Sequence, residues 1–257
     1  MLLFQEKKHF LTITINRPEA LNALTPDLIK QLTTAINGWS QKANIRVIVI
    51  TGAGERAFVG GVDVRFMKDL DPEGAEQFIT NLHQCFLAIR ESPKIIIASI
   101  NGYALGGGLE LAASCDLRLA SNRARFGMPE VKVGIPSVIE SALLPRLIGL
   151  GQAAELVYTG KMIDAQEAWR IGLVNKVVPH EELEAATQQL VREILQNAPT
   201  ALIIQKRLIA QWMEQPLSRG IAAGIKAFKE SYRTNEPRAG MEAFLEKRKP
   251  SYAIKED

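Results

Sequence analysis

Two continuous apolar segments constrain the fold most strongly: IRVIVITG at 45–52 and KIIIASI at 94–100. Both are rich in β-branched residues and lack alternating polar positions, which is typical of strands buried on both faces of a sheet. Each runs into a glycine-rich turn, AFVGGVD at 57–63 and NGYALGGG at 101–108, and a helical pattern follows. This alternation of strand and helix predicts an α/β fold.

Weaker patterns divide the rest of the chain. Shorter strand patterns are FLTITIN at 10–16, DLRLAS at 116–121 and LVNKVV at 173–178. From residue 137 onward, most segments show apolar residues at the three- and four-residue spacing of amphipathic helices. The segments with helical patterns are 26–42, 72–91, 109–115, 137–149, 151–159, 164–171, 180–197, 199–214, 217–234 and 236–248.

Composition and charge exclude several classes of function. A net charge of +3 over 257 residues is too small to argue for nucleic-acid binding. The sequence has no apolar stretch of membrane-spanning length and no secretory signal. Cys85 and Cys115 lie in apolar segments and are expected to be reduced core thiols. Because His9, His83 and His180 are scattered, we predict no metal site. We therefore expect a soluble, cytoplasmic protein.

The two glycine-rich corners are a candidate site. Ligands of α/β proteins bind at the carboxyl ends of strands, and a helix start offers unpaired N–H groups. Two such corners side by side could direct N–H groups at one oxygen, as in an oxyanion hole. Glu110 lies three residues after Gly107, in the first turn of the second helix, and Glu130 follows Pro129 in a later loop. If the two carboxylates converge, each raises the pKa of the other.

Each of these residues also has an ordinary structural explanation. The helix dipole alone favours an acidic residue such as Glu110 in a first turn. A loop glutamate such as Glu130 is usually solvated, and Asp63 fits the N-cap of a short helix. Glycine-rich loops are common in proteins. Taken singly, these residues leave a structural role and a catalytic role both open.

The combination of five segments carries more information than any one of them. The segments are NRPEALNAL (16–24), AFVGGVDVRFM (57–67), INGYALGGGLELAASCDLRLA (100–120), ARFGMPEVKVGIP (124–136) and GMEAFLEKRKP (240–250). In this order they resemble the crotonase superfamily, also called the enoyl-CoA hydratase/isomerase family. The resemblance implies a spiral of ββα units over residues 1–198. It also implies a C-terminal helical region, 199–257, that builds trimers, often paired into hexamers.

The resemblance further implies where an acyl-CoA thioester binds. By motif match, the backbone N–H groups of Val62 and Gly107 hold the thioester oxygen. The residues expected to contact the substrate or its CoA part are Ala20, Leu21, Ala23, Val59, Gly61, Asp63, Tyr103, Phe244 and Lys247. The last two belong to a helix that closes over CoA from this subunit or from a neighbouring one.

Hydratases of this family carry two glutamates, which match Glu110 in GGGLE and Glu130 in FGMPE. In such a hydratase, the glutamate matching Glu110 activates water for attack at C3, and the other delivers a proton to C2. The resemblance therefore predicts an enoyl-CoA hydratase, a lyase of fatty acid metabolism that forms 3-hydroxyacyl-CoA. This chemistry needs a base, an acid and N–H donors. It needs no metal and no cofactor, because CoA enters with the substrate.

The sequence departs from the family pattern after Pro136. A typical hydratase has a glycine-rich GAGGTQRL-like stretch that shapes the acyl pocket, whereas this chain has SVIESALLPRL at 137–147. Val138 and Glu140 are therefore candidates for an additional pocket wall. Glu140 could be a third active-site carboxylate. It also fits a capping box with Ser137 as N-cap, and we favour that role.

Two alternative functions stay open. The same site could catalyse another acyl-CoA reaction, such as double-bond isomerisation, thioester hydrolysis or C–C cleavage. A more distant alternative is a non-catalytic or RNA-binding relative, which the basic run KRK at 247–249 supports. A charge run is usually a solvated surface. The expected partners are therefore the acyl-CoA substrate and further copies of the chain, with no nucleic acid and no membrane.

Overall fold

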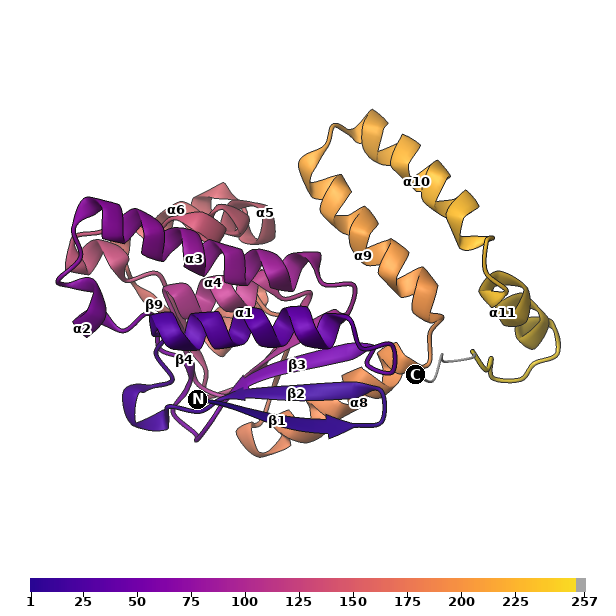
Figure 1. Ribbon diagram of the computed structural model, residues 1–257, viewed down its shortest axis with the longest axis horizontal. Helices are drawn as coiled ribbons and strands as arrows, with labels where there is room; N and C mark the ends of the chain where they lie inside the picture. Colours follow the sequence, from indigo (N-terminus) through magenta and orange to yellow (C-terminus); the bar gives the residue numbers. More distant parts are fainter. Residues whose placement is uncertain (253–257) are drawn as a thin grey trace.

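Two β-sheets form the centre of the computed structural model, in which the structure describes residues 1–252 (Figure 1). The larger sheet has the strand order β1 (Leu2–Lys7), β2 (Phe10–Ile15), β3 (Val47–Gly52), β5 (Ile95–Ile100), β7 (Leu117–Ser121) and β10 (Lys176–Val178). All its pairings are parallel except that of β1 with β2. The smaller sheet has the order β4 (Ala57–Val59), β6 (Tyr103–Leu105), β8 (Arg125–Gly127) and β9 (Met162–Asp164), of which β9 is antiparallel to its neighbour.

The chain alternates between the two sheets. Strands β3, β5 and β7 of the larger sheet are followed by β4, β6 and β8 of the smaller sheet, and helical structure comes next each time. The helical segments are α2 (Val64–Met67) and α3 (Pro72–Glu91) after β4, α4 (Gly107–Ser114) after β6, and the 3-10 helix η2 (Glu130–Val133) after β8. This succession has the ββα order that the sequence implied, and the predicted α/β class is confirmed.

Close backbone contacts make the corners between the sheets. A Cβ atom at Gly102 would lie 2.2 Å from the Arg56 carbonyl oxygen, so no larger residue fits there. The Asn101 side-chain amide donates to the carbonyl oxygens of Gly52 and Gly54, at 3.0 and 2.6 Å. These contacts join the corner after β3 to the corner after β5. As a result, β4 and β6 lie side by side and end at the same edge.

Helices cover both faces of the larger sheet. Ile48 and Ile50 of β3 belong to the main apolar core, which packs against α3 and α4. Val47 and Val49 of the same strand point the other way and pack with α8 (Leu183–Leu195). The predicted burial of this strand on both faces is thus confirmed. Helix α1 (Pro26–Ser40) also contributes to the main core.

The C-terminal helices are α9 (Pro199–Glu214), α10 (Leu217–Ser231) and α11 (Glu236–Leu245). The α9–α10 hairpin projects from the body, and α11 lies at the opposite end of the molecule from α2 (Figure 1). The boundary predicted between residues 198 and 199 falls in the turn from α8 to α9, and a division into two domains stays a prediction. Within residues 1–252, no helix is both long enough and apolar enough to cross a membrane.

The structure corrects the sequence analysis at several segments. The glycine-rich turns predicted at 57–63 and 101–108 each contain a short strand, β4 and β6. Strand β1 was missed because residues 3–6 of this edge strand are all exposed and show no alternation. The helix expected at 137–149 is instead the 3-10 helix η3 (Ile139–Leu143) followed by α5 (Leu144–Ile148). Pro145 lies in the first turn of α5, where a proline needs no N–H partner. The remaining helices are η1 (Pro18–Ala20), α6 (Leu150–Thr159), α7 (Ala165–Arg170) and η4 (His180–Glu182).

The capping box predicted between Ser137 and Glu140 is wrong. Neither side chain caps η3. The Ser137 hydroxyl donates to Glu130 Oε2 at 2.9 Å, and the Glu140 carboxylate accepts from His83 Nδ1 at 2.9 Å. The reason lies in Ile139, whose φ of +44° is incompatible with the regular helical first turn that a capping box requires.

The Lys206 ammonium attaches α9 to the body. It donates to Asp116 Oδ2 at 2.8 Å and to the carbonyl oxygens of Ile89 and Lys94 at 3.1 and 2.9 Å. Lys206→Ala removes the buried ion pair with Asp116, whose carboxylate keeps its hydrogen bond from Ile96 N–H, and should lower the free energy of unfolding by about 2–4 kcal/mol in urea denaturation. Lys30→Ala, at an exposed position of α1, is the control and should have little effect. Equal losses in both variants would contradict this role of Lys206.

Candidate active site

A cavity of about 580 Å³ lies between α2, α3, α4 and η2. Its size falls within the usual range for small-molecule sites. The wall is mainly apolar, with side chains such as Met67, Phe78, Ile79 and Leu82 from α2 and α3. Six residues selected from the sequence line this one cavity: Gly61, Val62, Gly107, Glu110, Glu130 and Val138.

The Glu110 carboxylate is buried against Ser141. Because α4 begins at Gly107, Glu110 lies in its first turn, and the residue is 4% exposed. Glu110 Oε1 accepts two hydrogen bonds from Ser141, from N–H at 2.9 Å and from Oγ–H at 2.6 Å. Burial is the main cause that raises the pKa of Glu110 to about 8. The Ser141 donors oppose this rise, and the charges of Glu130 and Glu140 add to it.

Glu130 approaches the start of α4 closely. A Cβ atom at Gly106 would lie 2.4 Å from Glu130 Oε1, so a larger residue there would displace the Glu130 carboxylate. Gly106 also has φ +52° and ψ −124°, a conformation that side chains disfavour. Burial raises the pKa of Glu130, and the hydrogen bond from Ser137 opposes that rise. The two glutamates thus converge on one cavity, which the sequence alone could not decide.

Two backbone N–H groups at the cavity wall have no partner. Leu24 bonds the peptide groups on both sides of Val62: its N–H donates to Gly61 O and its oxygen accepts from Asp63 N–H, each at 2.9 Å. In this parallel bridge the Val62 N–H points away from Leu24. Gly107 is the first residue of α4, where N–H groups lack a helical acceptor. Within residues 1–252, neither N–H donates to a protein acceptor.

Other predicted contact residues lie outside the cavity wall. They are Ala20, Leu21, Ala23, Val59, Asp63 and Tyr103. The Leu21 carbonyl accepts from Gly60 N–H at 2.8 Å, so this segment supports the glycine turn before Val62. The Asp63 carboxylate accepts from Arg65 N–H at 3.1 Å, which confirms the predicted cap, and pairs with Arg17 at 3.2 Å. A contact of these residues with CoA stays a prediction.

Phe244 and Lys247 are not brought to the cavity of their own chain. Phe244 lies on α11 and is 82% exposed, and Lys247 follows that helix. Since α11 and α2 lie at opposite ends of the molecule, the two residues are remote from the cavity beside α2 (Figure 1). Their predicted role in closing over CoA therefore requires a neighbouring copy of the chain.

Val138 and Glu140 have different surroundings. Val138 lines the cavity, whereas Glu140 is 3% exposed and directs its carboxylate toward His83 and Arg90 of α3. The sequence analysis missed Ser141, the donor to Glu110. A serine at this place carries no spacing signal, because the hydrogen bond joins residues 31 positions apart.

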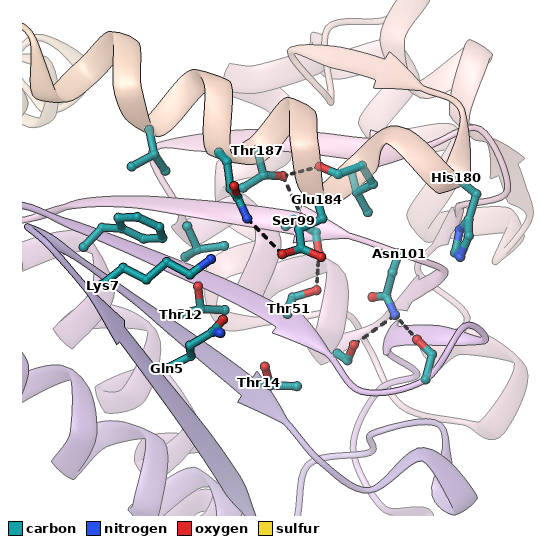
Figure 2. A pocket seen from close by; sticks show the side chains of 17 residues that line it. Gln5, Lys7, Thr12, Thr14, Thr51, Ser99, Asn101, His180, Glu184 and Thr187 are labelled. Carbon is teal, nitrogen blue, oxygen red and sulfur yellow. Dashed lines mark hydrogen bonds between the residues drawn. The ribbon is translucent and has the colours of Figure 1, made fainter.

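A second cavity, of about 330 Å³, lies between the larger sheet and α8 (Figure 2). Figure 2 shows Gln5 and Thr12 on the sheet side and Glu184 and Thr187 on the helix side. Asn101 Oδ1 is buried at this cavity without a partner in the described part of the chain. Glu184 is the one carboxylate among its described lining residues. It therefore lacks the paired carboxylates of the first cavity, which is the better candidate for catalysis.

Metal ligands and reactive thiols give no further candidate. Among residues 1–252, no three His, Cys, Asp or Glu side chains are placed to hold a metal ion together. Cys85 and Cys115 are free and buried, as predicted, and burial raises the pKa of both thiols to about 12. Such thiols are poor nucleophiles at neutral pH, because the thiolate is the reactive form.

Comparisons with known proteins agree with this geometry. The short-chain-enoyl-CoA hydratase of Clostridium acetobutylicum is 39% identical over 249 residues, which cover 96% of this chain and 95% of the relative. The crotonyl-CoA hydratase of Syntrophomonas wolfei is 38% identical over 255 residues, with 99% and 98% coverage. An enoyl-CoA hydratase structure from Bacillus anthracis has a TM-score of 0.95 at 34% identity, and 99% of each chain is covered.

The comparisons confirm the expected spiral of ββα units, since the solved structure matches both sheets and the C-terminal helices over nearly the whole chain. A sequence profile gives the same assignment, because residues 5–255 match the family described as Enoyl-CoA hydratase/isomerase. The chain belongs to the enoyl-CoA hydratase/isomerase family, the crotonase superfamily that its motifs resemble.

Proposed function

We propose that this protein is an enoyl-CoA hydratase that adds water across the 2,3 double bond of a short 2-enoyl-CoA. The observation that carries the proposal is the pair of carboxylates, Glu110 and Glu130, in one apolar cavity beside two unpartnered N–H groups. The relatives named short-chain-enoyl-CoA hydratase and crotonyl-CoA hydratase support this reaction and favour a short acyl group.

The N–H groups of Val62 and Gly107 hold the thioester oxygen in this proposal. Attack at C3 pushes electrons through the double bond onto that oxygen, which becomes enolate-like. Fixed N–H donors stabilise the developing negative charge most strongly where water is excluded. The two residues lie close together, since a Cβ atom added at Gly107 would lie 3.2 Å from Val62 Cγ2. This proximity supports the proposal that their N–H groups serve one oxygen atom.

The two glutamates divide the proton transfers. Ionised Glu110 takes one proton from water while the water oxygen bonds to C3. Protonated Glu130 gives its proton to C2, and the double bond becomes a single bond. Both hydrogens and the oxygen of water are then accounted for, and one proton returns from Glu110 to Glu130 through solvent. The two hydrogen bonds from Ser141 favour the ionised form of Glu110, but burial outweighs them and raises its pKa to about 8. The reaction therefore begins from the minor form of the pair, in which the single proton lies on Glu130.

The pair must carry one proton to be active. If both glutamates are protonated, no base is present, and if both are ionised, no acid is present. The sites interact, since the charge of Glu130 raises the pKa of Glu110, so pH dependence reports on the pair as a unit. The reaction as written uses no cofactor. The cytoplasmic location and the absence of a nucleic-acid partner stay predictions from the sequence.

We further propose that the chain forms a homotrimer, alone or paired into a hexamer. Helix α10 and its C-cap residue carry a stripe of apolar side chains at helical spacing, each more than half exposed: Leu217, Ile221, Ile225, Phe228 and, at the C-cap, Tyr232. Exposed apolar patches of this kind mark protein interfaces. A neighbouring copy would cover the stripe, and the α11 of one subunit could then approach the cavity of another.

The carboxylate pair gives the first test of this function. Glu110→Gln and Glu130→Gln each remove one proton-transfer group while keeping side-chain size. Each variant should lower kcat for hydration of a short 2-enoyl-CoA by at least about 100-fold, the lower range for general acid–base catalysis. The decay of the conjugated thioester absorbance measures the rate.

A matched control is Glu76→Gln, since Glu76 lines the same cavity but is exposed and has no role in the mechanism. It should change turnover little, and circular dichroism should show all three variants folded. If Glu110→Gln keeps near-full activity, the two-carboxylate mechanism is wrong and a reaction with a single carboxylate is preferred. Full activity on 3-enoyl-CoA but none on 2-enoyl-CoA would also contradict hydration.

The pH dependence gives the second test. Above the pKa of about 8 to which burial raises Glu110, the pair loses its last proton. The acid is then absent, so kcat/KM, which reports the free enzyme, should fall above about pH 8. Initial rates across the pH range check this, with the intact fold verified at each end. If kcat/KM does not fall on the alkaline side of the pH profile, the proposal that the pair shares one proton is contradicted.

The α10 stripe gives a test of assembly. Phe228→Glu places a charge in the stripe, and should shift the protein from trimer or hexamer toward the 28.4 kDa monomer. Light scattering after gel filtration measures the mass. Lys226→Glu, an exposed position of α10 outside the stripe, is the control and should leave the assembly intact. A monomeric wild-type protein at micromolar concentration would contradict the proposed trimer.

A further inference from the structure

One short turn supplies both hydrogen bonds that hold the Glu110 carboxylate. The N–H and the hydroxyl of Ser141 donate to the same oxygen, Oε1, at 2.9 and 2.6 Å. Ser141 lies in η3, which belongs to neither sheet. The direction and the acidity of Glu110 therefore depend on where η3 is held.

The start of η3 is strained. Ile139 has φ +44°, in the left-handed region that a β-branched residue rarely adopts. Its side chain packs against the main apolar core, which contributes to holding it. Strain of this kind persists only where surrounding contacts over-determine the conformation. A contact beyond this core packing must also hold the start of η3 in place.

Glu140 supplies that contact, because its carboxylate bonds to α3. Glu140 Oε1 accepts from His83 Nδ1 at 2.9 Å and lies 3.6 Å from the Arg90 guanidinium. His83 and Arg90 are seven residues apart, two helical turns, and so lie on one face of α3. Arg90 also pairs with Glu214 of α9, at 3.3 Å. The residue between Ile139 and Ser141 is thus tied to a rigid helix of twenty residues.

A purely stabilising role does not explain Glu140. The residue is 3% exposed, and Oε2 is buried without a hydrogen-bond partner in residues 1–252. A buried carboxylate with an unpaired oxygen is a costly way to fill a core position, and apolar residues often do so at no loss of stability. Glu140 also does not line the cavity, so it does not touch the substrate there.

We propose that Glu140 is a positioning residue: its contacts with His83 and Arg90 hold η3 so that Ser141 donates both hydrogen bonds to Glu110. The proposal rests on the hydratase function and assigns a role to the one stretch, SVIES, that departs from the family pattern. Glu140 thus acts on the reaction through Ser141 and Glu110.

Several charged groups face this network. The charges of Glu130 from η2 and of Glu140 from η3 both act on the Glu110 carboxylate and raise its pKa. Around Glu140, the neighbours that can carry a positive charge are His83 and Arg90 from α3. Glu214 of α9 reaches the network through Arg90. Loss of the Glu140 charge lowers the pKa of Glu110, whereas loss of the Ser141 donors raises it. The charge of Glu140 and its positioning of the Ser141 donors therefore shift the pKa of Glu110 in opposite directions.

Two variants separate charge from positioning. Glu140→Gln removes the charge but keeps an oxygen that accepts from His83, whereas Glu140→Ala removes both. Because the charge is absent in both, a difference between them reports on the Ser141 donors. We expect the pKa of Glu110 to be higher in Glu140→Ala than in Glu140→Gln. Ser141→Ala should likewise raise it above the wild-type value.

The pKa is measured by ¹³C NMR of protein labelled at glutamate carboxyls, and Glu110→Gln assigns the signal. In parallel, Glu140→Ala should lower kcat about 10- to 100-fold with little change in KM, the effect of a misplaced catalytic group. Glu140→Gln should restore most of that loss. The loss from Glu140→Ala should also be smaller in a Ser141→Ala background, since coupled residues are not additive.

Equal Glu110 pKa values and equal kcat in Glu140→Ala and Glu140→Gln would overturn the proposal, as would fully multiplicative losses in the double variant. Glu73→Gln, at an exposed position of α3 outside the network, is the control and should change neither quantity. Circular dichroism and gel filtration check that each variant is folded, and if Glu140→Ala is not, His83→Ala replaces it. The NMR measurement needs no substrate, so failure of the hydratase function is seen separately.

Discussion

Glycines 106–108 at the start of α4 let separate segments of the chain approach within contact distance. A Cβ atom at Gly108 would lie 2.0 Å from the Val59 carbonyl oxygen, and one at Gly106 would lie 2.4 Å from Glu130 Oε1. A side chain at Gly108 would push β4 away from the helix, and one at Gly106 would displace the Glu130 carboxylate. The shared cavity, the unpartnered N–H groups and the convergence of the two carboxylates all depend on this close approach.

That approach also buries an ionisable group, with a consequence for stability. The pKa of Glu110 rises from an ordinary 4.5 to about 8, mainly through burial. The folded protein therefore binds this proton more tightly than the unfolded chain does. By linkage, the contribution of Glu110 to stability is full below about pH 4.5 and is lost as the pH rises to about 8. A carboxylate used for proton transfer thus costs stability at the pH where it acts.

The sequence predicted the helices and strands that have local sequence patterns. It did not predict contacts between residues that are far apart in the sequence. The apolar runs at 45–52 and 94–100 gave two central strands, and the helix expected at 72–91 has those same ends. The motifs selected Glu110 and Glu130, but their convergence needed the glycine contacts of the folded chain. Ser141 could not be found, because its partner lies 31 residues away. The capping box failed because nothing in SVIES signals the positive φ of Ile139.

The central claim is that the carboxylate pair adds water to the double bond of an acyl-CoA. Incubation with a short 2-enoyl-CoA in ¹⁸O-labelled water, followed by mass spectrometry, tests this claim most directly. The account predicts a 3-hydroxyacyl-CoA with one ¹⁸O atom at C3, and one deuterium at C2 when the solvent is D₂O. Label in a free carboxylic acid would indicate thioester hydrolysis. Deuterium exchange with a shifted double bond and no ¹⁸O would indicate isomerisation, and either result would contradict the account.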